Sequence, residues 1–260
     1  MIKHPLISII TATHNRPEQL QSSAQSVLGQ NYTKWELLVI NDSTNEKSDA
    51  ILDDLDSHPQ VTVIQNEKNI GLAASRNKGL DAAEGTWITF LDDDDTLADA
   101  HALDRVVETI TKHKAPWFAF NRVDETGKSF TKPLTKKSQY NWTKDFLFGR
   151  NFRGDAVHFL SQKLLGKTRY TGTQRAQWKF WFILSQKSDF VHKAIPVTQA
   201  EYEETGLSSS RSLAEERVYM RQQFFEMSKR IETLKYLPVI AGRYLFTLPP
   251  LRQARQLLKR

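Results

Sequence analysis

The segment Ile88–Thr96 constrains the fold more than any other part of the chain. It reads Ile-Thr-Phe-Leu-Asp-Asp-Asp-Asp-Thr, so a short apolar run ends directly in four consecutive carboxylates. An apolar run of this length, bounded by polar residues, is typical of a buried strand. The aspartates then lie at the carboxyl end of that strand, the edge at which open α/β sheets bind ligands. We expect a helix to begin soon afterwards, near Ala98.

The four aspartates, Asp92–Asp95, have two interpretations. Clustered carboxylate oxygens are the preferred environment of hard cations such as Mg²⁺ and Mn²⁺, which favours a metal site that binds a phosphate group. Aspartate is also a good N-cap residue, so the cluster could be an acidic turn that caps the following helix. This segment alone leaves both interpretations open.

The first 120 residues alternate between strand and helix patterns. This alternation predicts βαβ units and an α/β fold with a mostly parallel, Rossmann-like sheet flanked by helices. The expected strands are Leu6–Thr11, Trp35–Ile40 and Val61–Ile64, and the expected helices follow Pro17, cross Ile51–Leu55 and run from Asn69 towards Gly85.

The pattern is less regular after this point. Trp117–Phe120 is expected to be a strand, Ala176–Ser185 a helix or buried segment, and Phe190–Tyr202 one or two strands. Residues 131–170 are basic and aromatic and match no single element. We predict one domain over residues 1–205, with halves at about 1–120 and 121–205, and a helical C-terminal region at 206–260.

The net charge of +6 is concentrated in that C-terminal region, where residues 206–260 hold eleven Lys/Arg and four Asp/Glu. An amphipathic helix is expected over Ser212–Leu237, and Leu251–Arg260 is a short basic amphipathic piece. Such segments suit an anionic membrane surface. The alternative is packing on the first domain or on a second subunit, as in a homo-oligomer. No basic stripe interleaved with aromatics indicates nucleic-acid binding.

The sequence also limits the compartment and the chemistry. It contains no cysteine, which excludes a disulfide scaffold, a thiolate zinc site and a thiol nucleophile. No stretch reaches the ~20 apolar residues of a membrane span, and no secretory signal pattern is present. We therefore expect a cytoplasmic protein, with peripheral binding to the inner face of the cell membrane as a further option.

Polar residues from other loops are expected at the same edge of the sheet as Asp92–Asp95. His14 and Arg16 follow the first strand, Asp42 follows the second, and Arg76 lies on the third helix. A flat ring, an acceptor for a ribose hydroxyl and cations for phosphate suit a nucleoside diphosphate. A dinucleotide is disfavoured, because no Gly-x-Gly-x-x-Gly turn follows the first strand.

Four ordered motifs within Ile7–Asp99 resemble the nucleotide-binding half of family 2 glycosyltransferases, which have the GT-A fold. The motifs are Ser8–Pro17 (Ser-Ile-Ile-Thr-Ala-Thr-His-Asn-Arg-Pro), Val39–Ser43 (Val-Ile-Asn-Asp-Ser), Asn69–Gly71 with Arg76–Gly79, and Leu91–Asp95. The resemblance implies a metal-dependent transferase that acts in surface polysaccharide or glycolipid synthesis.

The resemblance also implies roles for individual residues. Asp94 would bind Mn²⁺ or Mg²⁺ directly, while Asp92 and Asp93 would approach the ribose and the diphosphate. His14 stands where such enzymes commonly have tyrosine, so both UDP- and GDP-type donors stay open. Together with Arg76, the donor-binding residues are expected to be Ala12, His14, Arg16, Asp42, Asp92 and Asp93.

By the same resemblance, the transfer would invert the sugar's configuration, and a carboxylate would take the proton from the hydroxyl of a glycan or lipid-linked acceptor. The usual Glu-Asp pair is replaced by Ala176-Gln177. We expect a substitute base, first of all Asp155. The other candidates are His158, Glu201, Glu203 and Glu204.

Two alternative functions remain. The loss of the usual base at Ala176-Gln177 is compatible with a module that binds a nucleotide sugar without transferring it. The pattern Asp92-x-Asp94-x-Thr96 also fits haloacid-dehalogenase-type phosphatases. The phosphatase interpretation leaves Asp42 and the segment Asn69–Gly79 without a role.

Overall fold

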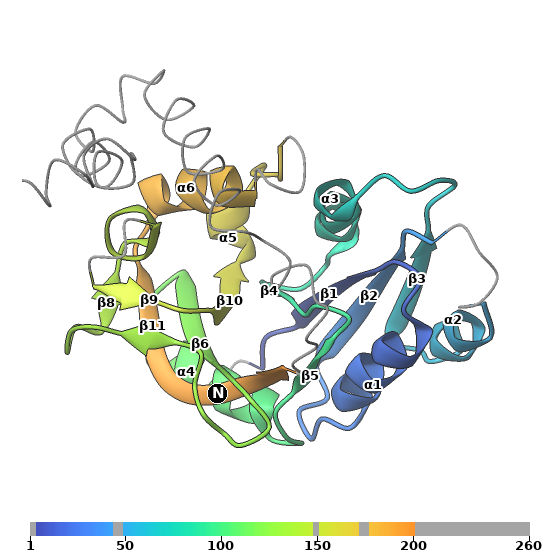
Figure 1. The fold of residues 1–260 in the computed structure, drawn as a ribbon, viewed down its shortest axis with the longest axis horizontal. Coiled ribbons are helices and arrows are strands. Elements are labelled where there is room, and N and C mark those ends of the chain that lie inside the picture. The colour runs from blue at the N-terminus through green and yellow to red at the C-terminus, as the bar shows by residue number, and fades with distance from the viewer. Residues whose placement is uncertain (1–3, 44–48, 148–150, 172–176, 201–260) are drawn as a thin grey trace, which may run out of the picture. The chain divides into compact units, whose positions relative to one another are not determined.

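The computed structural model describes residues 4–43, 49–147, 151–171 and 177–200 (Figure 1). These residues belong to a compact unit that spans Met1–Glu201. The predicted C-terminal region 206–260, with its amphipathic helix and its membrane or subunit contact, lies outside the described residues. Its boundary and its role stay predictions.

Strands and helices alternate through the described part of the chain. The strands are β1 (Ile7–Thr13), β2 (Trp35–Asn41), β3 (Val61–Gln65), β4 (Trp87–Phe90), β5 (Asp95–Leu97), β6 (Trp117–Val123), β7 (Lys132–Pro133), β8 (Gln139–Tyr140), β9 (Phe152–Arg153), β10 (Ala156–Ser161) and β11 (Phe190–Ala200). The helices are α1 (Pro17–Leu28), α2 (Asp49–Asp56), α3 (Leu72–Ala82), α4 (Ala102–Lys112), α5 (Gln162–Leu165), α6 (Gln177–Lys187) and a π-helical turn, η2 (Trp142–Leu147).

One large sheet joins most of these strands in the order β3-β2-β1-β4-β10-β6-β11-β5. The strands β3, β2, β1 and β4 are parallel, as the sequence predicts. Beyond β4 the sheet is mixed, because β10 runs antiparallel to both β4 and β6 while β11 is parallel to β6. The α/β fold is therefore confirmed, with an all-parallel part formed by the four N-terminal strands β1 to β4.

The strand order reverses direction between β1 and β4, the kind of position at which open α/β sheets bind ligands. From β1 the chain moves outward to β2 and β3 and then returns to β4 on the other side of β1. Figure 1 shows α1 and α2 on one face of these strands and α3 on the opposite face. Such a reversal leaves the carboxyl ends of the two central strands uncovered. The loops after Thr13 and Phe90 therefore lie at the same edge of the sheet.

The core on one face of the sheet comes from alternation in the strands and from the apolar stripe of α1. Ile7 and Ile9 of β1 are fully buried, and they belong to the same cluster as Leu20, Ala24 and Val27 of α1. Residues spaced three and four apart lie on one side of a helix, so these three residues form the inner face of α1.

The helix expected near Ala98 is wrong in its position. The strand β5 comes first, and α4 begins only at Ala102. Asp95–Leu97 pairs with Thr198–Ala200 of β11, and a partner about a hundred residues away leaves no signal in the local pattern. The interpretation of Asp92–Asp95 as a helix cap is therefore also wrong, since the N-cap residue of α4 is His101.

Gly79, within the motif Arg76–Gly79, lets α3 lie directly on β1. A Cβ at this position would come within 2.4 Å of Cγ2 of Ile10. We predict that Gly79→Ala lowers the free energy of unfolding by about 1–2 kcal/mol, because overpacking outweighs the gain in helix propensity. Urea denaturation measures this, with Lys78→Ala on the exposed side of α3 as the control. Equal or greater stability of Gly79→Ala would refute the close contact.

Candidate functional site

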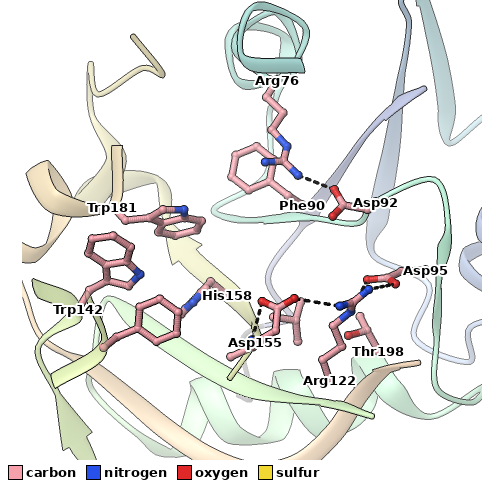
Figure 2. Close-up of a pocket in the computed structure, with 13 residues that line it drawn as sticks. Arg76, Phe90, Asp92, Asp95, Arg122, Trp142, Asp155, His158, Trp181 and Thr198 are labelled. Atoms are coloured by element: carbon pink, nitrogen blue, oxygen red, sulfur yellow. Dashed lines mark hydrogen bonds and ion pairs between the residues drawn. The ribbon is translucent and has the colours of Figure 1, made fainter. Parts of the chain in front are cut away.

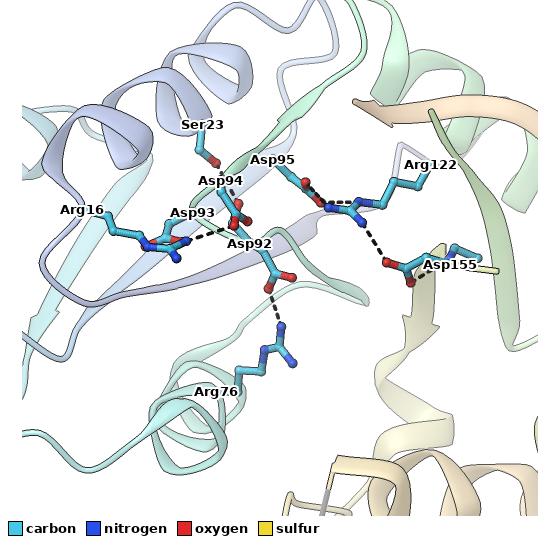
Figure 3. A network of polar contacts seen from close by, with 10 residues as sticks. Arg16, Ser23, Arg76, Asp92, Asp93, Asp94, Asp95, Arg122 and Asp155 are labelled. Atoms are coloured by element: carbon cyan, nitrogen blue, oxygen red, sulfur yellow. Dashed lines mark hydrogen bonds and ion pairs between the residues drawn. The ribbon is translucent and has the colours of Figure 1, made fainter. Parts of the chain in front are cut away.

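The turn Asp92–Asp95 directs its four carboxylates to cations from three different elements (Figure 3). The turn is closed by a hydrogen bond from the Asp95 N–H to the Asp92 carbonyl oxygen, 3.0 Å long. The cations are Arg16 after β1, Arg76 on α3 and Arg122 on β6. Mutual repulsion of the aspartates is thereby offset: Asp92 pairs with Arg76 and Asp95 with Arg122, while Asp93 and Asp94 share Arg16.

Asp93 and Asp94 both face the end of β1. Asp93 is buried and accepts a 2.8 Å hydrogen bond from the Thr13 hydroxyl, while Asp94 accepts a 2.9 Å bond from Nη1 of Arg16. Burial raises the pKa of Asp93 to about 6, although the Thr13 hydrogen bond and Arg16 oppose this. Asp94 keeps 32% of its side chain exposed. Of this adjacent pair, Asp94 is the carboxylate that a ligand can reach.

Asp92 forms an ion pair with Arg76, whose guanidinium lies beside two aromatic rings that contact each other. The guanidinium carbon of Arg76 is 5.2 Å from the ring centre of Phe90 and 5.8 Å from that of Tyr170. Burial opposes the charge on Arg76, but the Asp92 carboxylate raises its pKa. The predicted cation at this edge of the sheet is therefore held in one orientation beside the aspartates.

Asp42 is at the predicted edge, but its carboxylate already has protein partners. It accepts hydrogen bonds of 2.8 Å from the N–H groups of Ile70 and Gly71 and one of 2.9 Å from the Asn66 amide. A carboxylate offers about four acceptor positions. Asp42 therefore orders the start of the motif Asn69–Gly71 and retains capacity for about one further donor.

His14 lies at the end of β1 beside the end of β2, with its ring exposed. Nδ1 of His14 is 2.9 Å from the Asp42 carbonyl oxygen, so Nδ1 carries the proton that is donated. Asn15 adopts a left-handed conformation, with φ 59°, which asparagine tolerates better than most residues. This turn directs His14 towards Asp42 and Arg16 towards Asp94. Ala12 is in the adjoining part of β1.

A pocket of about 270 Å³ opens beside the turn Asp92–Asp95. Figure 2 shows that the charged side chains lie on one side of the pocket and aromatic side chains on the other. Asp155, at the start of β10, lies between the two groups. The charged side is formed by Arg76, Asp92, Asp95 and Arg122, and the aromatic side by Trp142, Phe146, His158 and Trp181.

Asp155 is the base candidate that the structure brings to this pocket. Its Oδ2 accepts a 2.9 Å hydrogen bond from Nη1 of Arg122, and its Oδ1 accepts one from the N–H of Ala156. The side chain is 63% exposed and lines the pocket. Partial loss of solvent beside the pocket raises the pKa of Asp155, while Arg122 opposes the shift.

His158 also lines the pocket, but its geometry disfavours a role as base. The Trp117 indole N–H donates a 3.0 Å hydrogen bond to Nδ1 of His158. A neutral ring with Nδ1 as acceptor carries its proton on Nε2. Burial lowers the pKa of His158 to about 3. The ring is therefore a neutral donor at physiological pH.

Buried neutral histidines make the fold sensitive to acid. The pKa of His192 is lowered to about 4 by burial, in addition to that of His158. The unfolded chain then binds more protons below about pH 6.5, so stability falls as the pH falls. We predict a loss of about 2 kcal/mol per histidine between about pH 7.5 and about pH 5.

This prediction is checked by urea denaturation at several pH values with the variant His158→Gln. The variant should lose about 2 kcal/mol less than the wild type over the same interval. The exposed His101 on the N-terminal side of α4 supplies the control variant His101→Gln, which should keep the wild-type slope. An unchanged slope in His158→Gln would show that the buried ring is not responsible.

The remaining base candidates are not described. These candidates, Glu201, Glu203 and Glu204, lie outside the described residues. The same holds for Ala176 and for the side chain of Gln177, which stand at the usual base position. The expected substitution at Ala176-Gln177 therefore stays a prediction.

Arg122, Trp142 and Trp181 line this pocket but are not among the site residues predicted from the sequence. Arg122 follows the apolar residues near the end of β6. A charged residue near the end of a buried strand was the sequence signal that could have indicated a site residue. Trp142 and Trp181 lie in segments without a clear periodic pattern, and only tertiary packing brings them together.

The aspartates fit a metal site in which a bound ligand supplies some of the coordinating oxygen atoms. Among the described residues, no three His, Cys, Asp or Glu side chains converge on one point. Mg²⁺ in nucleotide sites is usually held by one or two carboxylates together with phosphate oxygens and water. Asp94 and Asp92 are the exposed carboxylates of the turn, at 32% and 52%. They fit that kind of site, in which a diphosphate completes the coordination.

Comparison with known families agrees with this geometry. The sequence profile described as "Glycosyl transferase family 2" matches residues 8–169, which include the turn Asp92–Asp95 and Asp155. The chain belongs to glycosyl transferase family 2. This confirms the family that the four motifs indicate, and it gives no support to the phosphatase alternative.

One similar protein is the GalNAc(5)-diNAcBac-PP-undecaprenol beta-1,3-glucosyltransferase of Campylobacter jejuni. It is 28% identical over 239 residues, which are 88% of this chain and 74% of that protein. Across the curated relatives compared, this family 2 chain spans from 16% to 74% of their length.

Solved structures confirm the GT-A fold. TarS 1–349 of S. aureus in complex with UDP-GlcNAc has a TM-score of 0.71 at 18% identity, covering 92% of this chain and 71% of that one. The mannosyltransferase PcManGT of Pyrobaculum calidifontis, in complex with GDP-Man and Mn²⁺, has a TM-score of 0.65 at 14% identity, covering 94% and 70%. Within the described residues, no helix has the length and apolar character needed to cross a membrane.

Proposed function

We propose that this protein is an inverting glycosyltransferase that moves a sugar from a nucleoside diphosphate sugar to an acceptor hydroxyl. One observation carries the proposal: Asp92, an exposed carboxylate of the turn that also holds Asp94, lines the same pocket as Asp155 (Figure 2). A donor bound at the turn would place its anomeric carbon between the two.

The donor side would be formed by residues at the carboxyl ends of the parallel strands. The exposed ring of His14 and the remaining acceptor position of Asp42 suit the nucleoside. Arg16 and Arg76 place positive charge where the diphosphate would lie. Asp94 would hold Mn²⁺ or Mg²⁺ with Asp92 near it. When bound, the metal would stabilise negative charge on the departing diphosphate. The Mn²⁺ and GDP-Man of the mannosyltransferase support this choice.

On the acceptor side, Asp155 would take the proton from the attacking hydroxyl. Two of its roughly four acceptor positions are used by Arg122 and Ala156, which leaves two for the substrate. Partial loss of solvent raises the pKa of Asp155, which makes the carboxylate a stronger base, while the Arg122 cation favours its ionised form.

The aromatic side of the pocket suits the ring of an acceptor sugar. Trp181 is half-buried and offers an apolar ring face, Trp142 lines the pocket although it is only 4% exposed, and His158 offers an N–H donor. Aromatic walls with a few placed polar groups are typical of small-molecule sites. The acceptor would therefore be the sugar end of a glycan, free or lipid-linked, as in the Campylobacter jejuni relative's name.

The second candidate is a module that binds a nucleotide sugar without transferring it. This alternative is suggested by the sequence Ala176-Gln177 at the usual position of the base. The position of Asp155 in the pocket favours catalysis over this alternative.

The deciding experiment is turnover of UDP- and GDP-sugars with Mn²⁺ and a panel of free and lipid-linked glycans. We expect release of the nucleoside diphosphate together with a glycoside whose anomeric configuration is inverted, as proton NMR reports. Retained configuration would contradict the mechanism. Metal-dependent donor binding with no product on any acceptor would favour the binding module.

A further inference from the structure

Arg122 connects the turn Asp92–Asp95 to Asp155 across the pocket (Figure 3). Its Nε and Nη2 donate to the two carboxylate oxygens of Asp95, at 2.8 Å and 2.5 Å, and its Nη1 donates to Asp155 at 2.9 Å. The Phe130 ring, 5.7 Å from the guanidinium carbon, lies against it. One side chain on β6 thus contacts the segment that carries the proposed metal ligand and the proposed base.

The two ion pairs differ in environment. The side chain of Asp95 is only 8% exposed and binds Arg122 through both oxygens, whereas that of Asp155 is 63% exposed and binds through one. Burial opposes the charge on Arg122, but the hydrogen bonds and charge of Asp95 raise its pKa. A buried bidentate pair is rigid, and breaking it is costly, while an exposed pair contributes little to stability. Asp95 therefore holds Arg122 in place, and Arg122 in turn orients Asp155.

We propose that Arg122 is a positioning residue for catalysis, held by Asp95, which orients the Asp155 carboxylate towards the acceptor hydroxyl. This inference rests on the proposed function, since it assigns a task to Arg122 within the same reaction. The fourth aspartate of the cluster then has a task separate from metal binding. The guanidinium fork is required, because only arginine reaches both carboxylates with parallel N–H donors.

Thermal unfolding tests, without any substrate, whether the Asp95–Arg122 ion pair contributes more to stability than the Arg122–Asp155 ion pair. Asp95→Asn and Arg122→Gln should each lower Tm by roughly 5–15 °C, because the first leaves the half-buried Arg122 with only its exposed partner Asp155 and the second leaves the buried Asp95 carboxylate without its cation. Asp155→Asn should lower Tm by less than about 3 °C. Arg105→Gln is the matched control, because it removes a bidentate pair with Asp99 that lies on the surface. A decrease in Tm for Asp155→Asn as large as that for Asp95→Asn would contradict the proposal that Asp95 is the stronger partner of Arg122.

Turnover tests the catalytic part, with release of UDP from UDP-GlcNAc or of GDP from GDP-Man in the presence of Mn²⁺. Arg122→Gln should lower kcat by about 10–100-fold and change the KM for the donor by less than about threefold. Arg122→Lys should recover part of this loss through its charge. The double variant Arg122→Gln/Asp155→Asn should be no slower than Asp155→Asn alone, because Arg122 acts through Asp155. Losses that multiply in the double variant would show a merely structural role.

The outcomes separate this inference from the proposed function. If the wild-type protein shows no turnover but the variants show the expected order of Tm values, the proposed transferase activity is refuted. The arrangement in which Asp95 holds Arg122 and Arg122 contacts Asp155 would still be supported. An Asp155→Asn variant with wild-type kcat would overturn the role of Arg122 while leaving glycosyl transfer intact.

Discussion

Replacing Asp94 with alanine should abolish metal-dependent donor binding while leaving the fold intact. The affinity for UDP or GDP in the presence of Mn²⁺ should fall by at least about 100-fold, because even residues that only orient a metal ligand are worth about 10–100-fold. The fold should survive, since Asp94 contributes one partly exposed ion pair with Arg16, worth at most about 1 kcal/mol. Titration calorimetry measures the affinity, and thermal unfolding measures the fold.

Asp81→Ala is the matched control for this variant. Asp81 also forms a partly exposed ion pair with an arginine, Arg169, but it lies on α3 outside the pocket. Its removal should leave nucleotide affinity unchanged. If Asp94→Ala bound nucleotide and Mn²⁺ as well as Asp81→Ala did, Asp94 would not be the metal ligand.

The second large effect is expected for Asp155→Asn. Losing a general base costs about 10²–10⁴-fold in rate, and asparagine keeps the size of the side chain while it cannot accept the proton. We therefore expect kcat to fall by this factor, with donor affinity within about threefold of the wild type. Steady-state release of the nucleoside diphosphate gives kcat, and calorimetry gives the donor affinity.

Asp81→Asn is again the control, and it should keep wild-type kcat. A kcat of Asp155→Asn close to that of Asp81→Asn would transfer the role of base to another carboxylate. The undescribed Glu201, Glu203 and Glu204 would then be the next residues to replace.

The sequence was sufficient to place His14, Asp42 and the turn Asp92–Asp95 at one edge of the sheet, because that placement depends on local patterns. Apolar strands followed by polar loops predict where parallel strands end, and those ends meet at one edge of a sheet. His14, Asp42 and Asp92–Asp95 are found there, and Arg16 and Arg76 contact the aspartates as charge complementarity suggests.

The acceptor side depends on long-range pairing, which the local pattern does not contain. The short strand β5 exists because Asp95–Leu97 pairs with β11, and Asp155 reaches the pocket because β10 inserts between β4 and β6. Arg122 was missed for the same reason, since its two carboxylate partners are 27 and 33 residues away in the chain.

The central claim is that the turn Asp92–Asp95 binds a nucleoside diphosphate through a metal ion. Calorimetric titration of the wild-type protein with UDP and with GDP, each in Mn²⁺ and in EDTA, tests it most directly. We predict binding of at least one nucleotide in Mn²⁺ and a loss of at least about 100-fold in affinity in EDTA. Equal affinity in Mn²⁺ and EDTA, or no binding of either nucleotide, would contradict the claim.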